Sequence, residues 1–364
     1  MSDKIKKFIE CLVPVTACNL KCHYCYVIQG KYRYEEMPEW KYSPEYIVSA
    51  LTKKRFGGTC FFNICGAGET LLPKEIIKVI EGLLKEGHYV NITTNGTLSK
   101  RIDELLKIDN CYFERLSMSF SLHYIELKNK NLFDCFFNNI LKVKEAGISY
   151  LVQFNMCDDY IPYLEDMKNI CLEKLGVLPQ VALTRDVMKE EVAIYSKYSD
   201  EEYYNLGKQF NSPLWDFTNK NFKVKRKEFC YAGDWAFRLN IVTGDVKRCY
   251  CENYSQNIYE NIDKQIKYLP IGTGCKSQYC INSSHFLSLG LIPSLDTPTY
   301  ADLRYRIDKN NNNTYSNTML NALKTKLYDN NALIKNILMY KIKNFLFKKA
   351  LKLYSNKKKN KKLF

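Results

Sequence analysis

The sequence predicts an α/β fold in which helices cover a parallel sheet. From Met1 to about Arg185, short apolar or β-branched runs alternate with longer amphipathic runs, as in repeated βα units. An apolar fraction of 46% is enough for an ordinary buried core. Pro73, Pro162 and Gly147 stand where helices are expected to begin or end. This pattern fits either an open doubly wound sheet or a partial barrel.

The alternation predicts six strands and five helices in chain order. The apolar runs predict strands over residues 8–15, 60–65, 89–94, 115–121, 149–156 and 180–183. The amphipathic runs between them predict helices over residues 44–54, 74–86, 100–108, 132–146 and 162–175.

The repeating pattern stops after the sixth strand, where a second region begins. A polar, tyrosine-rich connection over 195–205 leads to a basic stretch over 220–227, and a hairpin is expected from 237–242 and 246–251 around Gly244. The asparagine run from Asn310 to Asn313 is typical of a linker. We therefore expect a core over 1–200, a connection over 201–229, a small domain over 230–300, a linker over 301–330 and a tail over 331–364.

The fifteen cysteines indicate metal binding rather than disulfides. No segment near Met1 combines a basic start, a long apolar run and a cleavage site. We therefore expect a reducing, cytoplasmic location, where clustered cysteines are more often metal ligands. No run reaches the roughly 18 apolar residues of a spanning helix.

The net charge of +15 is concentrated at one end of the chain. Residues 331–364 hold eleven lysines and no Arg, Asp or Glu, and subtracting these charges leaves +4 for the rest. The basic character therefore belongs to a tail, and we expect no nucleic-acid-binding face on the folded body.

Three cysteines close together follow the first predicted strand. Cys18, Cys22 and Cys25 can converge on one metal centre, and a cubane cluster held by three thiolates leaves one iron open. The alternatives are coincidence or a zinc site completed by His23. This spacing, with Tyr24 before the third cysteine, resembles the signature of the radical S-adenosylmethionine (radical SAM) enzymes. The resemblance implies a partial (β/α)6 barrel, a 4Fe-4S cluster, S-adenosylmethionine (SAM) and a 5′-deoxyadenosyl radical that abstracts a substrate hydrogen.

A glycine turn after the second predicted strand strengthens this resemblance. In the run from Cys65 to Thr70, glycines allow close backbone approach and a carboxylate can bind an ammonium. The run resembles the family's Gly-Gly-Glu motif, with Ala67 as a departure, which implies that Glu69 receives the methionine amine. By the same resemblance, the cofactor-binding residues are Tyr24, Gly66, Gly68, Glu69, Asn95, Ser119 and Ser121.

Other polar residues at predicted strand ends are candidates for contacting the substrate. His123 stands where relatives often carry an aspartate, and Arg185 follows the sixth strand. We name these two as candidate catalytic residues, although a structural role for the histidine is the simpler alternative. Gln153 and Asn155 also lie toward the carboxyl ends of strands, where ligands bind in parallel α/β folds.

A second cysteine set lies in the region after residue 229. Cys230, Cys249, Cys275 and Cys280 can form a four-thiolate site, with Cys251 as an alternative to Cys249. The set resembles the auxiliary-cluster domains called SPASM and twitch, which implies a second 4Fe-4S cluster. A structural zinc site on the same thiolates is the alternative.

The tail has a helical amphipathic pattern. Apolar residues recur between lysines at Ile334, Ile337, Leu338, Ile342, Phe345, Leu346 and Leu353, and a lysine-rich run follows at 357–362. Such a helix suits an anionic membrane surface, which would make the protein peripheral on the inner face of the membrane. The alternatives are a helix packed on the body with a solvated end and, less favoured, a tail that binds nucleic acid.

Together these features predict a radical SAM oxidoreductase-like enzyme. We expect oxidation or epimerisation of a small or glycan-linked substrate, because the barrel begins within ten residues of Met1 and leaves no room for a fused N-terminal peptide-binding domain. A reducing donor such as flavodoxin or ferredoxin is implied by the family. The alternatives are a peptide-modifying SPASM maturase and a non-enzymatic, metal-holding scaffold.

Overall fold

The computed structural model describes residues 4–252, 255–334, 338–346 and 349. Its main feature is a nine-stranded sheet with the strand order β11-β10-β9-β1-β2-β3-β4-β5-β6. From β1 to β6 every neighbouring pair is parallel. The predicted α/β fold is therefore confirmed.

All six predicted strands are present, each within two residues of the expected bounds. They are β1 (Lys7–Val13), β2 (Cys60–Gly66), β3 (Tyr89–Thr94), β4 (Leu116–Ser121), β5 (Ser149–Asn155) and β6 (Gln180–Ala182). Their spatial order follows their chain order without reversal. Right-handed crossovers then place the connecting helices on one face, which is a barrel arrangement rather than a doubly wound sheet.

The helices predicted between the strands are also present. They are α2 (Pro44–Ala50) and α3 (Lys53–Phe56), which divide one predicted helix, and α4 (Glu75–Lys85), α5 (Ser99–Leu105), α7 (Phe133–Glu145) and α8 (Leu164–Leu175). The division occurs because Thr52 caps a new helix by accepting a hydrogen bond from Arg55 N. Two short helices, α1 (Tyr26–Gln29) and α6 (Tyr124–Asn129), and two 3-10 helices, Asn110–Arg115 and Asp158–Tyr163, were not expected.

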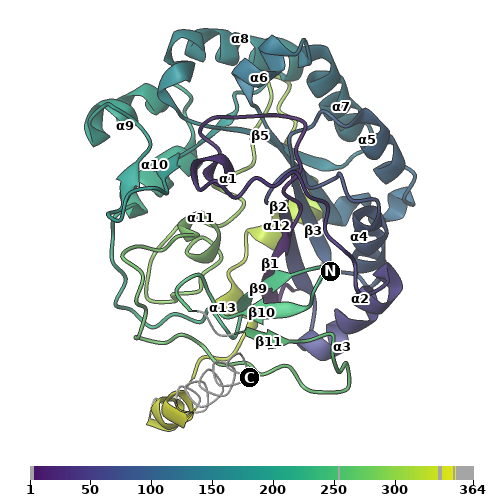
Figure 1. The fold of residues 1–364 in the computed structure, drawn as a ribbon, viewed down its shortest axis with the longest axis vertical. Coiled ribbons are helices and arrows are strands. Elements are labelled where there is room, and N and C mark those ends of the chain that lie inside the picture. Colours follow the sequence, from purple (N-terminus) through teal and green to yellow (C-terminus); the bar gives the residue numbers. More distant parts are fainter. Residues whose placement is uncertain (1–3, 253–254, 335–337, 347–348, 350–364) are drawn as a thin grey trace.

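The helices form an arc around the strands (Figure 1). The side of the sheet that they cover is filled by large apolar residues from strands and helices, including Ile64, Ile92, Phe120 and Phe136. This packing leaves the opposite side of β1 to β6 facing the interior of the partial barrel.

The predicted hairpin extends the same sheet. β9 (Ala236–Asn240) pairs antiparallel with β10 (Asp245–Lys247), so the hairpin is confirmed, although its second strand ends at Lys247 and not at residue 251. β11 (Ser255–Asn257) adds a third strand. β9 also lies parallel to β1, with Phe8 opposite Ala236. The cysteine-bearing second region is therefore joined to the barrel through the first strand.

The expected connection over 195–205 is wrong in part, because half of it is helical. α9 (Asp200–Lys208) begins there, with Ser199 and Glu202 forming a reciprocal capping box. It is followed by α10 (Pro213–Asn221), and it is preceded by a two-stranded sheet of β7 (Arg185–Asp186) and β8 (Ala193–Ile194). Local capping thus outweighs the polar composition of this segment.

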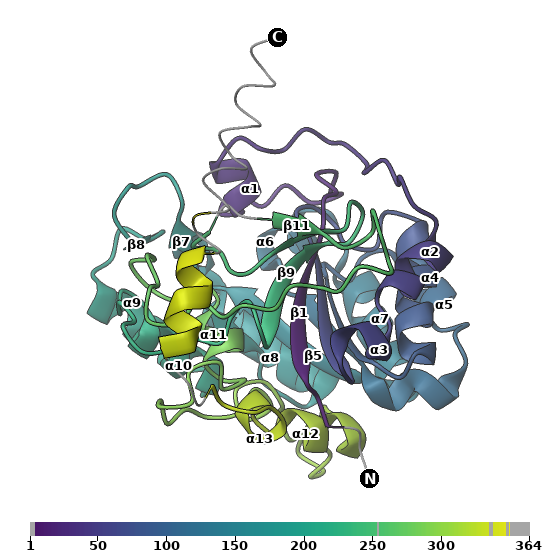
Figure 2. The same ribbon diagram turned by 90° about the horizontal axis from the view of Figure 1, so that it is seen from below.

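The expected linker over 301–330 is also wrong. This segment contains α12 (Asn317–Leu323) and α13 (Leu327–Asn330), preceded by α11 (Ser283–Phe286). Met319 and Leu323 are fully buried in a cluster with Phe8 and Phe61. In Figure 2, α12 and α13 lie beneath the strands, near the N-terminus.

The asparagine run before these helices forms a tight turn. The Asp308 carboxylate accepts hydrogen bonds from the backbone N–H groups of Asn310 and Asn312, at 2.9 Å each. Polar side chains here cap a turn instead of marking an unstructured linker.

The tail is helical over residues 338–346. Ile337, Leu353 and the lysine-rich run at 357–362, on which the sequence prediction also relied, lie outside the described residues. Within the described part of the chain, no helix is both long and apolar enough to cross a membrane.

Replacement of Leu323 tests whether the segment 301–330 belongs to the core. Leu323→Ala should lower the free energy of unfolding by about 2 to 5 kcal/mol, because a buried leucine leaves a cavity. Urea denaturation measures the change, and Lys324→Ala on the exposed side of the same segment is the control. Equal stability of the two variants would show that this segment does not belong to the core.

Candidate active site

The loop that follows β1 is bound to the glycine turn that follows β2. Gly68 N donates to Val15 O at 2.6 Å, and Glu69 N donates to Ala17 O at 3.0 Å. These bonds extend the parallel pairing of the two strands beyond their ends. A Cβ atom on Gly68 would collide with the Ala17 carbonyl, so only glycine permits this approach.

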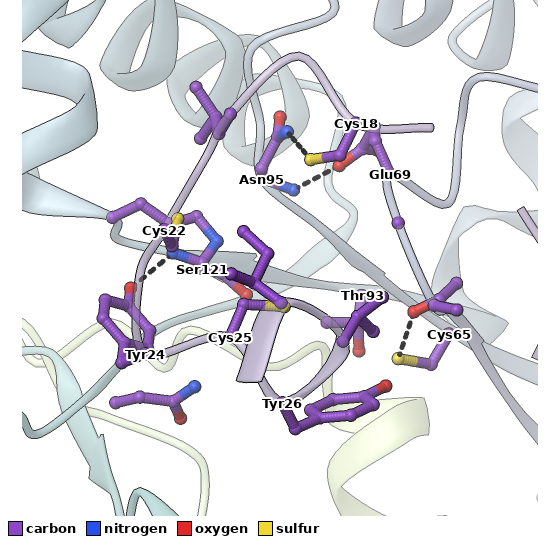
Figure 3. Close-up of a pocket in the computed structure, with 18 of the residues that line it drawn as sticks. Cys18, Cys22, Tyr24, Cys25, Tyr26, Cys65, Glu69, Thr93, Asn95 and Ser121 are labelled. Atoms are coloured by element: carbon purple, nitrogen blue, oxygen red, sulfur yellow. Dashed lines mark hydrogen bonds between the residues drawn. The ribbon is translucent and has the colours of Figure 1, made fainter. Parts of the chain in front are cut away.

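Cys18, Cys22 and Cys25 line one side of a cavity of about 310 Å³ at the carboxyl ends of the strands (Figure 3). Burial raises the pKa of the Cys18 and Cys22 thiols above their ordinary value. Arg33, which also lines the cavity, donates to the carbonyl oxygens of Leu20 and Cys18 and thereby fixes the loop. The sequence had not indicated this arginine, which lies eight residues beyond Cys25.

The three thiols fit a multinuclear cluster better than a single metal ion. All fifteen cysteines are free thiols. Among the described residues, no three His, Cys, Asp or Glu side chains are arranged to hold one metal ion. The His23 imidazole lies 3.3 Å from the Asp159 carboxylate. In a cubane cluster each thiolate binds a different iron, so the thiols stand further apart. Positive iron would also stabilise thiolates that burial alone disfavours.

Glu69 and Asn95 line the same cavity beside Cys18 (Figure 3). The Glu69 carboxylate accepts hydrogen bonds from Thr94 Oγ1 at 2.6 Å and from Asn95 N at 2.8 Å. Burial raises the pKa of Glu69, while these hydrogen bonds oppose that shift. The Asn95 amide group lies 3.7 Å from Cys18 Sγ, so the predicted amine-binding and cluster-binding residues are neighbours (Figure 3).

Tyr24 and His123 are hydrogen-bonded to each other. Tyr24 OH lies 2.6 Å from His123 Nδ1 and 2.9 Å from Tyr160 OH. Burial lowers the pKa of His123 to about 4, so the imidazole is neutral near pH 7. In this arrangement His123 holds the aromatic residue of the cysteine loop, and it also borders the cavity.

The remaining predicted residues divide between two cavities. Gly66, Ser121, Gln153, Asn155 and Arg185 line the cysteine cavity. Ser119 lines a second, inner chamber of about 260 Å³ instead, where its hydroxyl donates to Asn91 Oδ1 at 3.1 Å. Both cavities share walls formed by Cys65, Thr93, Gln153, Leu183 and Arg185.

A row of polar side chains in the inner chamber was missed at the sequence level. Glu10 pairs in register with Asn63, which pairs with Asn91, which pairs with Ser117. Hydrogen bonds run along the row: Asn63 to Glu10 at 3.1 Å, Asn91 to Asn63 at 2.7 Å and Ser117 to Asn91 at 2.8 Å. The available signal was a polar residue among apolar neighbours in three strands, namely Glu10 in β1, Asn63 in β2 and Asn91 in β3.

Glu10 lies at the end of this row and faces the chamber. Its second oxygen accepts a hydrogen bond from Asn282 Nδ2 at 2.8 Å. Desolvation raises the pKa of Glu10 to about 7, and the amide hydrogen bonds together with Arg238 and Arg304 oppose the shift. The lining of the chamber therefore combines one carboxyl group, that of Glu10, with several amide and hydroxyl groups.

The second cysteine set also gathers in one place. Cys230, Cys249, Cys275 and Cys280 all pack at the edge of a single apolar cluster, together with Cys251. The Cys251 thiol interacts with Cys249 and Cys275, and Cys230 and Cys280 interact electrostatically with Cys275. The structure thus brings five thiols together, and both cysteines of the pair 249 and 251 remain candidate ligands.

Comparison with known proteins agrees with this geometry. Residues 12–160 match the family model described as the radical SAM superfamily. Among curated proteins, none matches this chain. Two similar solved structures are those of SuiB from Streptococcus suis. One is bound to S-adenosylmethionine (TM-score 0.50, 18% identity, 71% of this chain) and one to its precursor peptide SuiA (TM-score 0.51, 17% identity, 71% of this chain).

The matches span 65% and 64% of those SuiB chains, which is less than two thirds of their length. At this level of identity the likeness supports the fold alone, and the family match rests on the segment that carries the cysteine motif and the glycine turn. Radical SAM proteins as a family use a 4Fe-4S cluster and SAM, which agrees with the donor groups in the cavity. Residues 12–160 of this chain therefore match the radical SAM superfamily both in sequence and in the groups that line the cavity.

Proposed function

We propose that this chain is a radical SAM enzyme that holds two 4Fe-4S clusters and acts on a small or glycan-linked substrate by oxidation or epimerisation. One observation carries the proposal: three thiols and a buried carboxylate share a cavity that adjoins a polar inner chamber. With cluster and SAM bound, radical SAM chemistry supplies a 5′-deoxyadenosyl radical that removes a substrate hydrogen atom.

The residues around the first cavity bind and orient the cofactors. Cys18, Cys22 and Cys25 hold the cluster, and Glu69 accepts hydrogen bonds from the methionine ammonium of SAM. Thr94 and the Asn95 backbone hold the Glu69 carboxylate in place, so its acceptor lone pairs are already oriented before SAM binds. Gly66, Asn95 and Ser121 offer further contacts on the cavity wall.

The inner chamber is the proposed substrate site. Its volume of about 260 Å³ suits a small, sugar-sized group. Glu10 offers an acceptor for a substrate hydroxyl, and Arg185 stands on the wall that the two cavities share. We infer from this position that Arg185 orients the substrate beside SAM. The neutral His123 positions Tyr24 instead of transferring protons.

The second thiol set is the proposed ligand set of an auxiliary cluster. Cys230, Cys275 and Cys280 hold it with Cys249 or Cys251, and its role is to accept or relay an electron. A reducing protein such as flavodoxin or ferredoxin supplies the electron that starts each reaction. The alternative of a peptide-modifying enzyme is favoured by one observation, the likeness in fold to SuiB bound to its precursor peptide.

Iron content and SAM cleavage separate these enzymatic functions from a metal-holding scaffold. After anaerobic reconstitution the chain should hold about eight irons, as two cubane clusters require, and form 5′-deoxyadenosine on reduction. The triple variant Cys18→Ala, Cys22→Ala, Cys25→Ala should keep about four irons and form no 5′-deoxyadenosine.

The double variant Cys275→Ala, Cys280→Ala is the matched comparison. It should also fall to about four irons but still cleave SAM, while Cys111→Ala, at an exposed cysteine, should change neither quantity. Stoichiometric zinc with no 5′-deoxyadenosine from the unaltered chain would contradict the proposal.

Removal of the Glu69 charge tests the amine site. Glu69→Gln should weaken SAM binding roughly 10- to 100-fold, because a hydrogen bond to a charged group is lost. Equilibrium dialysis with the reconstituted protein measures the affinity, and Glu173→Gln on the outer surface of α8 is the control. Unchanged SAM affinity in Glu69→Gln would exclude this role.

The pH dependence of stability tests the environment of Glu10. Its folded-state pKa of about 7 lies above the ordinary 4.5, so the folded state binds more protons between these values. Stability should fall as pH rises from about 4.5 to about 7, by up to about 3 kcal/mol. In urea denaturation, the free energy of unfolding of Glu10→Gln should not show this fall between pH 4.5 and pH 7. That of Glu173→Gln should still show it. Parallel pH profiles of Glu10→Gln and the unaltered chain would contradict a raised pKa.

A further inference from the structure

The tail helix over residues 338–346 presents an apolar face that is exposed in the described part of the chain. Large apolar side chains are exposed at Leu338 (70%), Met339 (54%), Ile342 (48%), Phe345 (62%) and Leu346 (57%). At 3.6 residues per turn these five positions share one side of the helix, roughly 120° wide. Figure 1 shows this helix projecting from the lower edge of the body.

The opposite side of the same helix holds it to the body. Tyr340 is buried, and its hydroxyl lies 2.9 Å from the carbonyl oxygen of Ile271. Its ring packs on Phe229 at a centroid distance of 4.8 Å, and Asn344 Nδ2 donates to the Tyr340 hydroxyl at 3.2 Å. A side chain at Gly272 would collide with the tyrosine ring. The helix is therefore attached by one face, and the apolar face points away from the body.

Lysines border the apolar face on both sides. Lys341 and Lys343 are exposed, and helical spacing puts one at each edge of the apolar side. The Lys349 ammonium lies 5.7 Å from the Phe345 ring centroid. Long lysine side chains at such borders place their apolar stems with the apolar face and their charges in water.

A basic groove adjoins this face. An open groove of about 460 Å³ is lined by residues 264–269 and by Lys343, and it includes the exposed Lys264 and Lys267. The body thus adds positive charge beside the apolar side of the helix. Both features suit a surface that is apolar inside and anionic at its boundary.

We propose that this helix adsorbs to an anionic lipid bilayer, with its apolar face among the acyl chains and the basic groove at the headgroups. A second copy of the chain is a poorer partner, because two tails with eleven lysines each would repel one another. A nucleic acid would pair with the lysines but would leave the five apolar side chains in water. The proposal is independent of the proposed enzymatic function.

Sedimentation with lipid vesicles tests this proposal on the full chain. The unaltered protein should sediment with vesicles of equal parts phosphatidylcholine and phosphatidylglycerol, and at least tenfold less with phosphatidylcholine alone. The triple variant Leu338→Ser, Ile342→Ser, Phe345→Ser keeps every charge and should bind roughly a hundredfold more weakly. The matched control replaces three exposed apolar residues elsewhere, Leu172, Val224 and Ile307, with serine and should bind as the unaltered chain does.

Several results would overturn the proposal. The unaltered chain would fail to sediment with anionic vesicles, or it would bind equally well to both lipid compositions. Alternatively, the Leu338, Ile342, Phe345 variant would bind anionic vesicles as strongly as the unaltered chain does. Self-association by sedimentation equilibrium that this variant abolishes, without vesicle binding, would assign the face to a second copy. Binding of polyuridylate without vesicle binding would assign the lysines to nucleic acid. Thermal melting of each variant verifies that the body remains folded.

Discussion

The backbone pairing between the cysteine loop and the glycine turn is the constraint on which the candidate site depends. Hydrogen bonds from Gly68 and Glu69 to Val15 and Ala17 hold the two loops side by side just beyond the ends of β1 and β2. Because a Cβ at Gly68 would displace Ala17, one missing side chain determines how close Cys18 lies to Glu69. The candidate cluster ligands and the carboxylate therefore share one cavity, because the backbone holds the two loops together.

The first strand connects every functional part of the molecule. It ends in the cysteine loop, carries Glu10 in its middle and pairs with both β2 and β9. Through β9 it joins the region where the second thiol set gathers. One continuous sheet thus carries the strands that lead to the cysteine cavity, line the inner chamber and join the region of the second thiol set.

Features that depend on local sequence could be predicted, and features that depend on distant pairing could not. The six strands followed from apolar runs, and Cys18, Cys22 and Cys25 from their spacing. The chamber was missed because Glu10, Asn63 and Asn91 meet only when three strands align, although each is a polar residue within an apolar strand. The helices α12 and α13 were missed because the preceding asparagine run, which forms a capped turn at Asp308, resembled a linker.

Electron paramagnetic resonance of the reduced, reconstituted chain with and without SAM tests the central claim most directly. The account predicts signals from two reduced 4Fe-4S clusters, of which SAM alters only one, because only the cluster held by Cys18, Cys22 and Cys25 has an iron without a protein ligand. A spectrum that SAM leaves unchanged, or the absence of any cluster signal, would contradict the account.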